Sequence, residues 1–192
     1  MEISGGGFNR FLEFFNDLSS TWTKVEFCQH YDESGFEGYD AFLRGEHELV
    51  KKSVRDMVIQ QDVYRIAHSR DISMTRVRAY DEPLSAYLTQ FEIHAYRADE
   101  EMGESIVVVN RGVAQSIAGG PVGDYLLFDN RRLVCLVYSQ EDPATLQSAW
   151  LCENSNEIAR YRQITDDLIQ ASQPIFENAL FQVQSIADEG EK

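Results

Sequence analysis

The sequence predicts an α+β fold, in which a mainly antiparallel β-sheet is flanked by N-terminal helices and by a long, Pro-interrupted C-terminal helix. Runs of alternating or β-branched residues between positions 72 and 139 are typical of strands. Apolar residues at helical spacing precede and follow this stretch. A length of 192 residues, of which 43% are apolar, suits one domain with a buried core.

Three helices and one strand are predicted in the N-terminal third. Apolar side chains recur at helical spacing over residues 8–18, which indicates a short amphipathic helix. Apolar and charged side chains alternate within residues 21–31, as in a half-buried strand. Residues 36–44 form a short helix that ends at Gly45, because glycine is the usual residue after a helix end. The next predicted helix covers residues 48–67 and has a broad apolar stripe.

The middle of the chain alternates between predicted strands and segments that fit more than one kind of structure. Residues 73–80 alternate and predict a strand, after which Pro83 stands at the first position of a helix. Residues 91–96 fit either a helix or a strand by periodicity. The β-branched run 105–109 predicts a buried strand, and residues 112–117 either pair with it or form a loop.

A hairpin and one further strand complete the predicted sheet. Residues 125–128 and 133–138 are strands, and the turn-forming residues 129–131 between them indicate a tight hairpin. Residues 146–151 form the last predicted strand.

The C-terminal helix is predicted to begin at Asn154, because Glu157 follows three residues later as in a capping box. Pro174 then kinks or restarts the helix. The apolar stripe beyond it either packs on its own domain or offers a surface for a homodimer or another partner. The chain thus divides into a flexible N-terminus (1–7), a single α+β domain (8–176) and a C-terminal helical extension with a charged tail (177–192).

The net charge of −15 disfavours direct binding to nucleic acid, because phosphate contacts need an excess of Lys and Arg. Residues 44–80 carry eight basic and five acidic residues, a net +3, so the remainder carries −18. Such a field either steers a basic protein partner or only keeps the chain soluble. No apolar run is long enough for a membrane span, and the N-terminus lacks the pattern of a secretion signal, so we expect a cytoplasmic protein.

Sequence motifs for catalysis are missing from the chain. It has no phosphate-binding loop, no dinucleotide fingerprint, no hydrolase nucleophile elbow and no zinc-protease motif. Its three cysteines and four histidines have no metal-ligand spacing. The sequence therefore predicts no catalytic residue, no metal and no cofactor, and it leaves open whether the protein is an enzyme.

The most suggestive polar residues lie around the strand at 73–80. Arg76 and Arg78 are two positions apart on a strand and so point to the same face, where two guanidinium groups could hold a phosphate or a carboxylate. The alternative is that they pair with acidic residues across the sheet, which is the commoner use of such sets. The candidate ligand-binding residues are Arg76, Arg78, Glu92, His94 and Glu104.

Several segments, in order along the chain, resemble a bacterial family of unknown function. Residues 76–88 (RVRAYDEPLSAYL) are similar to its RVRVV-x-EPL-x-DY core, and residues 124–129 (DYLLFD) to its DFWLFD strand. Shorter similarities lie at 42–45 (FLRG), 103–106 (GESI) and 159–162 (ARYR). Together they resemble the DUF6879 family, which is mainly actinobacterial. The resemblance implies a cytoplasmic protein often encoded beside helix-turn-helix regulators, with no established activity and no catalytic residues.

Three hypotheses about function follow. The leading one is a non-enzymatic regulatory or interaction protein whose acidic surface meets a basic partner, such as a helix-turn-helix regulator. The second is an enzyme or binding protein for a small anionic ligand, such as a nucleotide or an aminoacyl-type group, held by Arg76 and Arg78. Unpaired arginines in a cleft would favour it, and salt-bridged arginines on a closed sheet would exclude it. The third and weakest is DNA mimicry by regularly spaced carboxylates.

Overall fold

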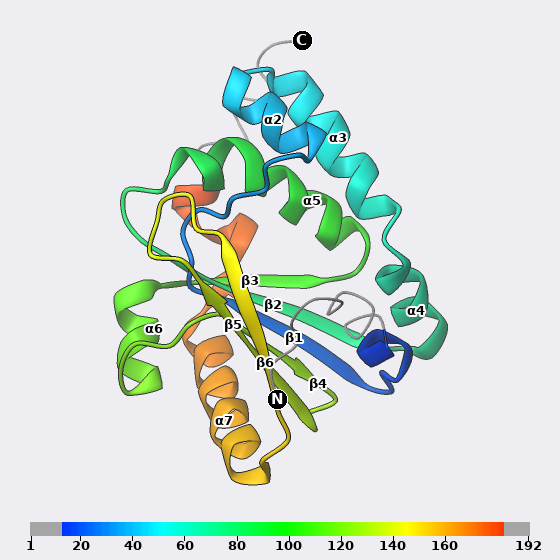
Figure 1. Cartoon of the computed structure of the whole chain (residues 1–192), viewed down its shortest axis with the longest axis vertical. Coiled ribbons are helices and arrows are strands. Elements are labelled where there is room, and N and C mark those ends of the chain that lie inside the picture. Colours follow the sequence, from blue (N-terminus) through cyan, green and yellow to red (C-terminus); the bar gives the residue numbers. More distant parts are fainter. Residues whose placement is uncertain (1–12, 183–192) are drawn as a thin grey trace.

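A seven-stranded mixed sheet forms the centre of the computed structural model, which describes residues 13–182 (Figure 1). The strand order is β6-β5-β4-β1-β2-β3-β7. The strands are β1 (Thr21–Glu26), β2 (Ser73–Tyr80), β3 (Ser105–Asn110), β4 (Tyr125–Phe128), β5 (Arg132–Tyr138), β6 (Leu146–Cys152) and β7 (Gln173–Pro174). The helices are α2 (Glu37–Arg44), α3 (His47–Ile59), α4 (Asp62–Arg70), the π-helical η1 (Leu88–Glu92), α5 (Ile93–Glu101), α6 (Arg111–Ala118), α7 (Ser155–Ala171) and the 3-10 helix η2 (Ile175–Glu177).

The α+β class is confirmed, but the prediction of a mainly antiparallel sheet is wrong in its centre. β1, β2 and β3 are parallel, whereas β4, β5 and β6 continue the sheet in antiparallel pairs. Parallel neighbours need crossover connections. Helices α2 to α4 make the crossover between β1 and β2, and η1 with α5 makes the one between β2 and β3.

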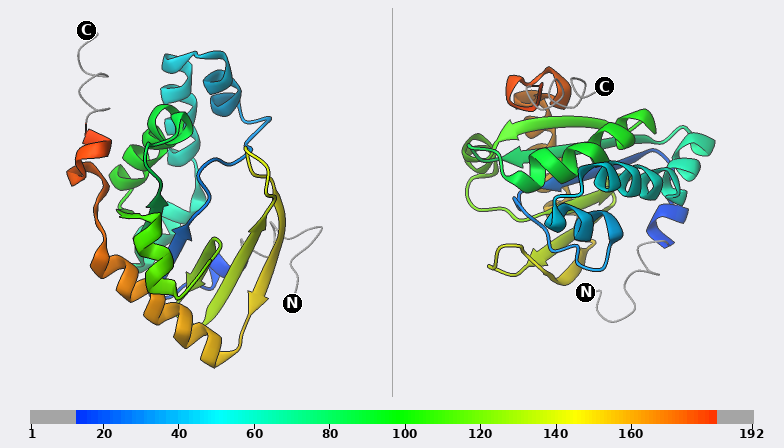
Figure 2. Two further views of the ribbon diagram at one scale, coloured as in Figure 1. Left: turned by 90° about the vertical axis from the view of Figure 1, so that its left-hand side faces the viewer. Right: turned by 90° about the horizontal axis from the view of Figure 1, so that it is seen from above.

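Each face of the sheet has its own core, because side chains alternate along the strands. Val25 and Val77 belong to one apolar cluster, together with Ala114 of α6 and Leu168 of α7. The other face carries the larger cluster, which includes residues of α2, α3 and α5. Figure 2 shows α7 on one side of the sheet and α2 and α3 on the other. The candidate site lies on the α3 and α5 side.

Two predicted helices have different bounds in the structure. The segment predicted as one helix over residues 48–67 is divided into α3 and α4, which meet at Gln60 and Gln61. Pro83 lies in a bend, so it is not the first helical residue as predicted. Helical backbone begins at Ala86, because the Ser85 hydroxyl accepts a hydrogen bond from the Leu88 amide (3.2 Å) and caps the first turn. Residues 91–96 are helical, which decides the open alternative.

Residues 112–117, predicted as a strand or a loop, form most of α6 instead. Asn110 caps this helix by accepting a hydrogen bond from the Gly112 amide (2.9 Å). Gly119 ends it with a left-handed backbone (φ 75°). Both cap residues of this helix are thus visible in the sequence. Only 8 residues lie between them, which is too short a segment to show a clear helical period.

The C-terminal helix ends at Ala171, so Pro174 does not kink a longer helix as predicted. Gln173 and Pro174 instead pair with β3 at the edge of the sheet, where proline is tolerated because its missing N–H leaves no ladder hydrogen bond unmade. Ile175 and Phe181 beyond it are fully buried, and the Phe181 ring lies 5.6 Å from that of Tyr80. The part of this segment that the structure describes therefore packs on its own domain, and homodimer formation through it stays a prediction.

Some predictions fall outside the described residues: the flexible segment 1–7, the start of the helix at 8–18 and the tail at 183–192. Of the first predicted helix, residues 13–16 are described and are helical. None of the helices within residues 13–182 is long and apolar enough to cross a membrane.

Candidate functional site

The floor of the candidate site is built by the parallel pair β1 and β2. Their register places Lys24 beside Arg76 and Glu26 beside Arg78. All four side chains point to the same face of the sheet, because each pair is two residues apart on its strand. Glu26 and the three basic side chains thus lie next to one another and form one compact ionic layer.

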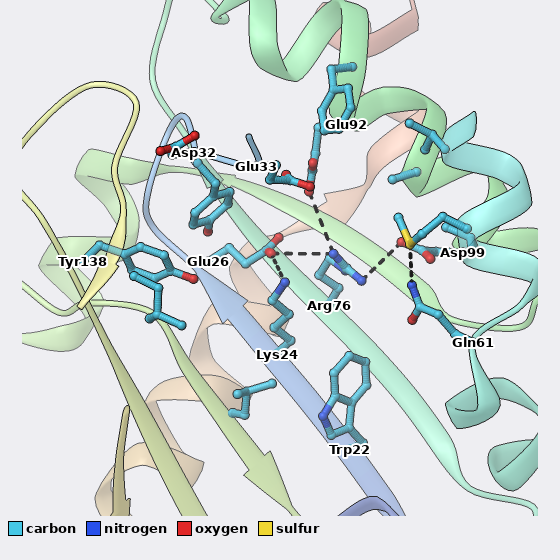
Figure 3. Close-up of a pocket in the computed structure, with 18 of the residues that line it drawn as sticks. Trp22, Lys24, Glu26, Asp32, Glu33, Gln61, Arg76, Glu92, Asp99 and Tyr138 are labelled. Carbon is cyan, nitrogen blue, oxygen red and sulfur yellow. Dashed lines mark hydrogen bonds and ion pairs between the residues drawn. The ribbon is translucent and has the colours of Figure 1, made fainter. Parts of the chain in front are cut away.

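A cavity of about 410 Å³ lies over this floor (Figure 3). Its charged lining consists of five carboxyl groups and two cations, namely Glu26, Asp32, Glu33, Glu92, Asp99, Lys24 and Arg76. Aromatic rings form much of the remaining wall, from Phe15, Trp22, Tyr31, Phe91 and Tyr138. The cavity is thus acidic, with apolar surface that could cover the stem of a long side chain.

Arg76 is surrounded by carboxylates. Its Nε lies 2.9 Å from Glu104 Oε1, and its Nη2 lies 3.2 Å from both Glu104 Oε2 and Asp99 Oδ2. Nη1 faces Glu26 Oε1 at 3.6 Å and Glu92 Oε1 at 4.0 Å. The bidentate pair with Glu104 uses the fork of donors that suits a carboxylate. Arg76 therefore compensates the acidic wall, with Nε and Nη2 already bound to carboxylates and Nη1 facing two more beyond hydrogen-bond distance.

Arg78 is fully buried beneath the cavity. Its Nη1 donates to the Tyr31 hydroxyl (3.1 Å) and lies 3.8 Å from Glu26 Oε2, while its Nε and Nη2 have no hydrogen-bond partner within the described chain. Burial opposes the ionisation of Glu26, but Lys24, Arg76 and Arg78 outweigh it and lower its pKa to about 2. Glu26 is thus an ionised carboxylate, with Lys24 Nζ at 2.5 Å.

Two tyrosines each bridge a pair of carboxyl groups. The Tyr64 hydroxyl lies 2.5 Å from Asp99 Oδ1 and 2.9 Å from Glu104 Oε2. The Tyr87 hydroxyl is hydrogen-bonded to Glu33 Oε1 and lies 2.7 Å from Glu92 Oε2. Burial, together with the charge of Glu92, raises the pKa of Glu33 to about 7. Burial and the charge of Glu104 raise the pKa of Asp99 to about 6, although Arg76 opposes the shift.

The predicted site residues are brought together only in part. Arg76 and Glu92 line the cavity, Glu104 is paired with Arg76, and Arg78 is buried on the same face of the sheet without lining the cavity. His94 is half-buried on α5 and does not line the cavity. Both arginines pair with acidic residues, which is the alternative that the sequence favoured.

Sequence reasoning missed most of the other polar groups of the cavity. Lys24 and Glu26 fall on the charged face of the half-buried strand predicted within residues 21–31, and the available signal was Trp22, which shares that face. Glu33 comes from a turn, and Tyr87 from the apolar stripe of the helix predicted after Pro83, so no single pattern joined them. Asp99 lies on α5, in a segment for which the sequence predicts no site residue.

The described residues contain no group of three or more His, Cys, Asp or Glu side chains that could hold a metal ion. Cys28, Cys135 and Cys152 are free thiols and are half-buried. The polar groups at the cavity are its carboxyl groups, the tyrosines that bridge them and the cations paired with them.

Fold and site define an α+β domain with a mixed sheet and an acidic, aromatic-walled cavity on one of its faces. The sequence model of the family described as "Domain of unknown function (DUF6879)" matches residues 9–178. The chain belongs to this family, as the resemblance of its segments predicted. No curated protein matches it.

Two solved structures have weak similarity to the fold. The archaeal chromatin protein TrmBL2, whose structure shows a novel mode of DNA binding, aligns with a TM-score of 0.42 and 9% identity over 88% of this chain and 51% of that chain. The chain thus spans about half the length of that protein. NucT from Helicobacter pylori aligns with a TM-score of 0.45 and 8% identity over 87% of this chain and 89% of that chain.

Proposed function

We propose that this protein is a non-enzymatic interaction protein whose acidic cavity receives a basic side chain of a protein partner. The observation that carries the proposal is the charge of the cavity, where five carboxyl groups face two cations. Both cations are already paired, Lys24 with Glu26 and Arg76 with four carboxyl groups. The cavity therefore has an excess of negative charge that an incoming ammonium or guanidinium group would offset.

The remaining charge of the molecule supports the same class of partner. The net charge of −15 would attract a basic protein before contact is made. The aromatic wall, which includes Trp22 and Tyr138, would cover the aliphatic stem of a Lys or Arg side chain and could face its cationic group. A DNA-binding protein of the helix-turn-helix class is one partner with this chemistry.

The contacts of Arg76 and Arg78 weigh against the alternative, a small anionic ligand. An anion could reach Nε and Nη2 of Arg76 only by displacing Glu104 or Asp99, and at Nη1 it would face the carboxylates of Glu26 and Glu92. Two nitrogens of Arg78, Nε and Nη2, have no hydrogen-bond partner within the described chain, but the side chain is fully buried and does not line the cavity. Reaching it would need the floor of the site to open.

The proposal is tested by fluorescence anisotropy with a labelled octalysine peptide as probe and an octaserine peptide as its neutral control. We expect the full chain to bind octalysine with an affinity that falls as salt is raised. The double variant Glu33→Gln with Glu92→Gln should weaken binding about tenfold, which corresponds to about 1.4 kcal/mol.

The matched control is Glu157→Gln with Asp166→Asn, which makes the same change in charge on the exposed face of α7, on the opposite side of the sheet. If both double variants weaken octalysine binding equally, the cavity has no special role and the attraction comes only from the overall charge. That result would refute the proposal for this site.

A further inference from the structure

The Tyr87 hydroxyl lies between two carboxyl groups that it cannot satisfy alone. It is within hydrogen-bond distance of Glu33 Oε1, and 2.7 Å separate it from Glu92 Oε2. A tyrosine hydroxyl has one hydrogen and therefore donates to only one of these oxygens. The other contact is a hydrogen bond only if the carboxyl group itself carries a proton and donates it. Both contacts are therefore hydrogen bonds only when the Glu33–Tyr87–Glu92 cluster holds one proton more than the tyrosine supplies.

The cations near this cluster are paired more closely with other carboxyl groups. Within residues 13–182, Glu33 forms no ion pair, and Glu92 has only Arg76 at 4.0 Å. The charged and titratable groups that face the cluster come from β1, β2, β5, the loop after β1, α2 and α5: Lys24, Glu26, Arg76, Arg78, His30, Tyr31, Asp32, Tyr39, Tyr96, Asp99 and Tyr138. Arg78 lies 3.8 Å from Glu26 Oε2 and forms no ion pair with Glu33 or Glu92 within the described residues. Lys24 pairs with Glu26, Arg76 with Glu104 and Asp99, and His30 Nδ1 contacts Asp142 (2.9 Å).

A second cluster in the same site, the Tyr64 cluster of Tyr64, Asp99 and Glu104, shows how a tyrosine between two carboxyl groups can accompany a bound cation. Tyr64 also bridges two carboxyl groups, Asp99 and Glu104, at 2.5 and 2.9 Å. There the guanidinium of Arg76 lies within 3.2 Å of both carboxyl groups and compensates their charge. The two clusters thus differ in the position of the guanidinium: it lies within 3.2 Å of both carboxyl groups at Tyr64, whereas at Tyr87 it lies 4.0 Å from Glu92 and forms no ion pair with Glu33 within the described residues.

We propose that the Glu33–Tyr87–Glu92 cluster is the site for the cationic group of the ligand, a guanidinium or an ammonium, which replaces the shared proton when it binds. The inference rests on the function proposed above. It adds the position of the bound cation and the exchange of a proton for that cation. No covalent bond changes, because the proton leaves a carboxyl oxygen for solvent as the cation enters. The cluster then has the composition of the Tyr64 cluster, with the ligand in the role of Arg76.

The proton exchange makes binding dependent on pH. Burial and the charge of Glu92 raise the pKa of Glu33 to about 7, so about half of the molecules hold the proton at neutral pH. A cation that needs both carboxylates ionised binds more tightly as pH rises through this value. The apparent affinity should therefore increase about tenfold from about pH 6 to about pH 8. Binding at neutral pH should release about half a proton.

Isothermal titration calorimetry with Nα-acetylarginine methylamide as probe tests this on the full chain. The heat is measured in phosphate and in Tris, whose ionisation enthalpies differ, so that the difference counts the protons released. We expect the full chain to release protons on binding at neutral pH. The variant Glu33→Gln should lose both this proton release and the dependence of affinity on pH. Asp32→Asn is the matched control, because Asp32 lines the same cavity without contacting Tyr87, and it should keep both.

The outcomes separate this inference from the proposed function. If the probe and octalysine bind in the cavity without proton release and with equal affinity at each pH, the exchange is refuted while the proposed function stands. If neither binds, both fail. Carboxyl carbon NMR of the ligand-free protein gives a reading without any ligand. A glutamate that titrates near pH 7 and is lost in Glu33→Gln supports the shared proton, and ionisation of every glutamate below about pH 5 overturns it.

Discussion

Arg76 and Arg78 are two residues apart on one strand face, yet their surroundings differ in kind. Arg76 has its donors directed at four carboxyl groups, which without it would leave uncompensated charge in a buried layer. Arg78 is buried more completely but directs only Nη1 at partners, and its Nε and Nη2 remain without acceptors within the described chain. Buried donors without acceptors cost stability, so the two arginines should contribute unequally.

We expect Arg76→Met to lower the free energy of unfolding by about 3–5 kcal/mol, because removing one partner of a buried ion pair leaves the others uncompensated. Arg78→Met should cost less, about 1–2 kcal/mol, because it also removes two unsatisfied donors. Urea denaturation at neutral pH measures both values. Equal losses, or a larger loss for Arg78→Met, would show that the ionic layer is not centred on Arg76.

The candidate site could be predicted from the sequence at the strand positions and hardly at all elsewhere. The alternation around Arg76 and Arg78 correctly placed both side chains on one face. Glu26 could not be joined to them, because nothing local indicates that β1 lies parallel to β2 in that register. Glu33 and Tyr87 meet through tertiary packing between a loop and the turn before η1, which no periodicity records.

At the scale of elements, α7 depends on its N-terminal cap. The Asn154 side chain accepts hydrogen bonds from the amides of Asn156 (3.0 Å) and Glu157 (3.2 Å), which would otherwise lack partners in the first turn. This helix packs Ile158 and Leu168 against the second face of the sheet. Fraying of its first turn would therefore also loosen that core.

Asn154→Ala should lower the free energy of unfolding by about 1 kcal/mol, the usual cost of losing such a cap. Asn156→Ala is the matched control, because Asn156 is exposed inside the first turn and alanine is the better helix former there. Its free energy of unfolding should stay the same or rise slightly. Thermal and urea denaturation compare the two variants, and a loss of stability that is equal in both would exclude the capping role.

Elements with a strong local signal were predicted well, and their mutual arrangement was not. β2, β3, β4, β5 and α2 were correct to within a residue or so, because alternation, β-branched runs and the Gly45 helix end are local features. The parallel pairing of β1, β2 and β3 depends on crossovers of many residues. Pro174 was assigned to a helix kink because the sequence does not reveal that β3 has a free edge beside it.

At the scale of the whole molecule, one cavity contains carboxyl groups whose pKa values are shifted in opposite directions. Lys24, Arg76 and Arg78 outweigh the effect of burial on Glu26 and lower its pKa from 4.5 to about 2, so the folded state favours its charge. Burial raises the pKa of Glu33 from 4.5 to about 7 and that of Asp99 from 3.8 to about 6, so the folded state favours their protonated forms. Stability should therefore pass through a maximum between these two ranges.

The direction on each side of the maximum follows from the protons bound. Below about pH 4.5 the unfolded chain takes up a proton at Glu26 before the folded chain does, so the free energy of unfolding falls as pH falls. Above about pH 5 the folded chain holds protons at Glu33 and Asp99 that the unfolded chain has lost, so it falls as pH rises. We expect a loss of about 2–3 kcal/mol from about pH 5 to about pH 8, after allowing for solvent screening at the partly exposed Glu33.

Urea denaturation across this range, repeated with Glu33→Gln, distinguishes the cavity from the general charge of the molecule. Repulsion within a chain of net charge −15 also grows with pH, but it is spread over the whole surface and is screened by salt. The neutral glutamine cannot ionise, so the variant should lose stability about half as steeply between about pH 5 and about pH 8, at low and at high salt alike. If Glu33→Gln leaves the slope of the free energy of unfolding against pH unchanged, or if salt abolishes that slope, the pH dependence comes from surface charge. Either result would exclude the cavity as its source.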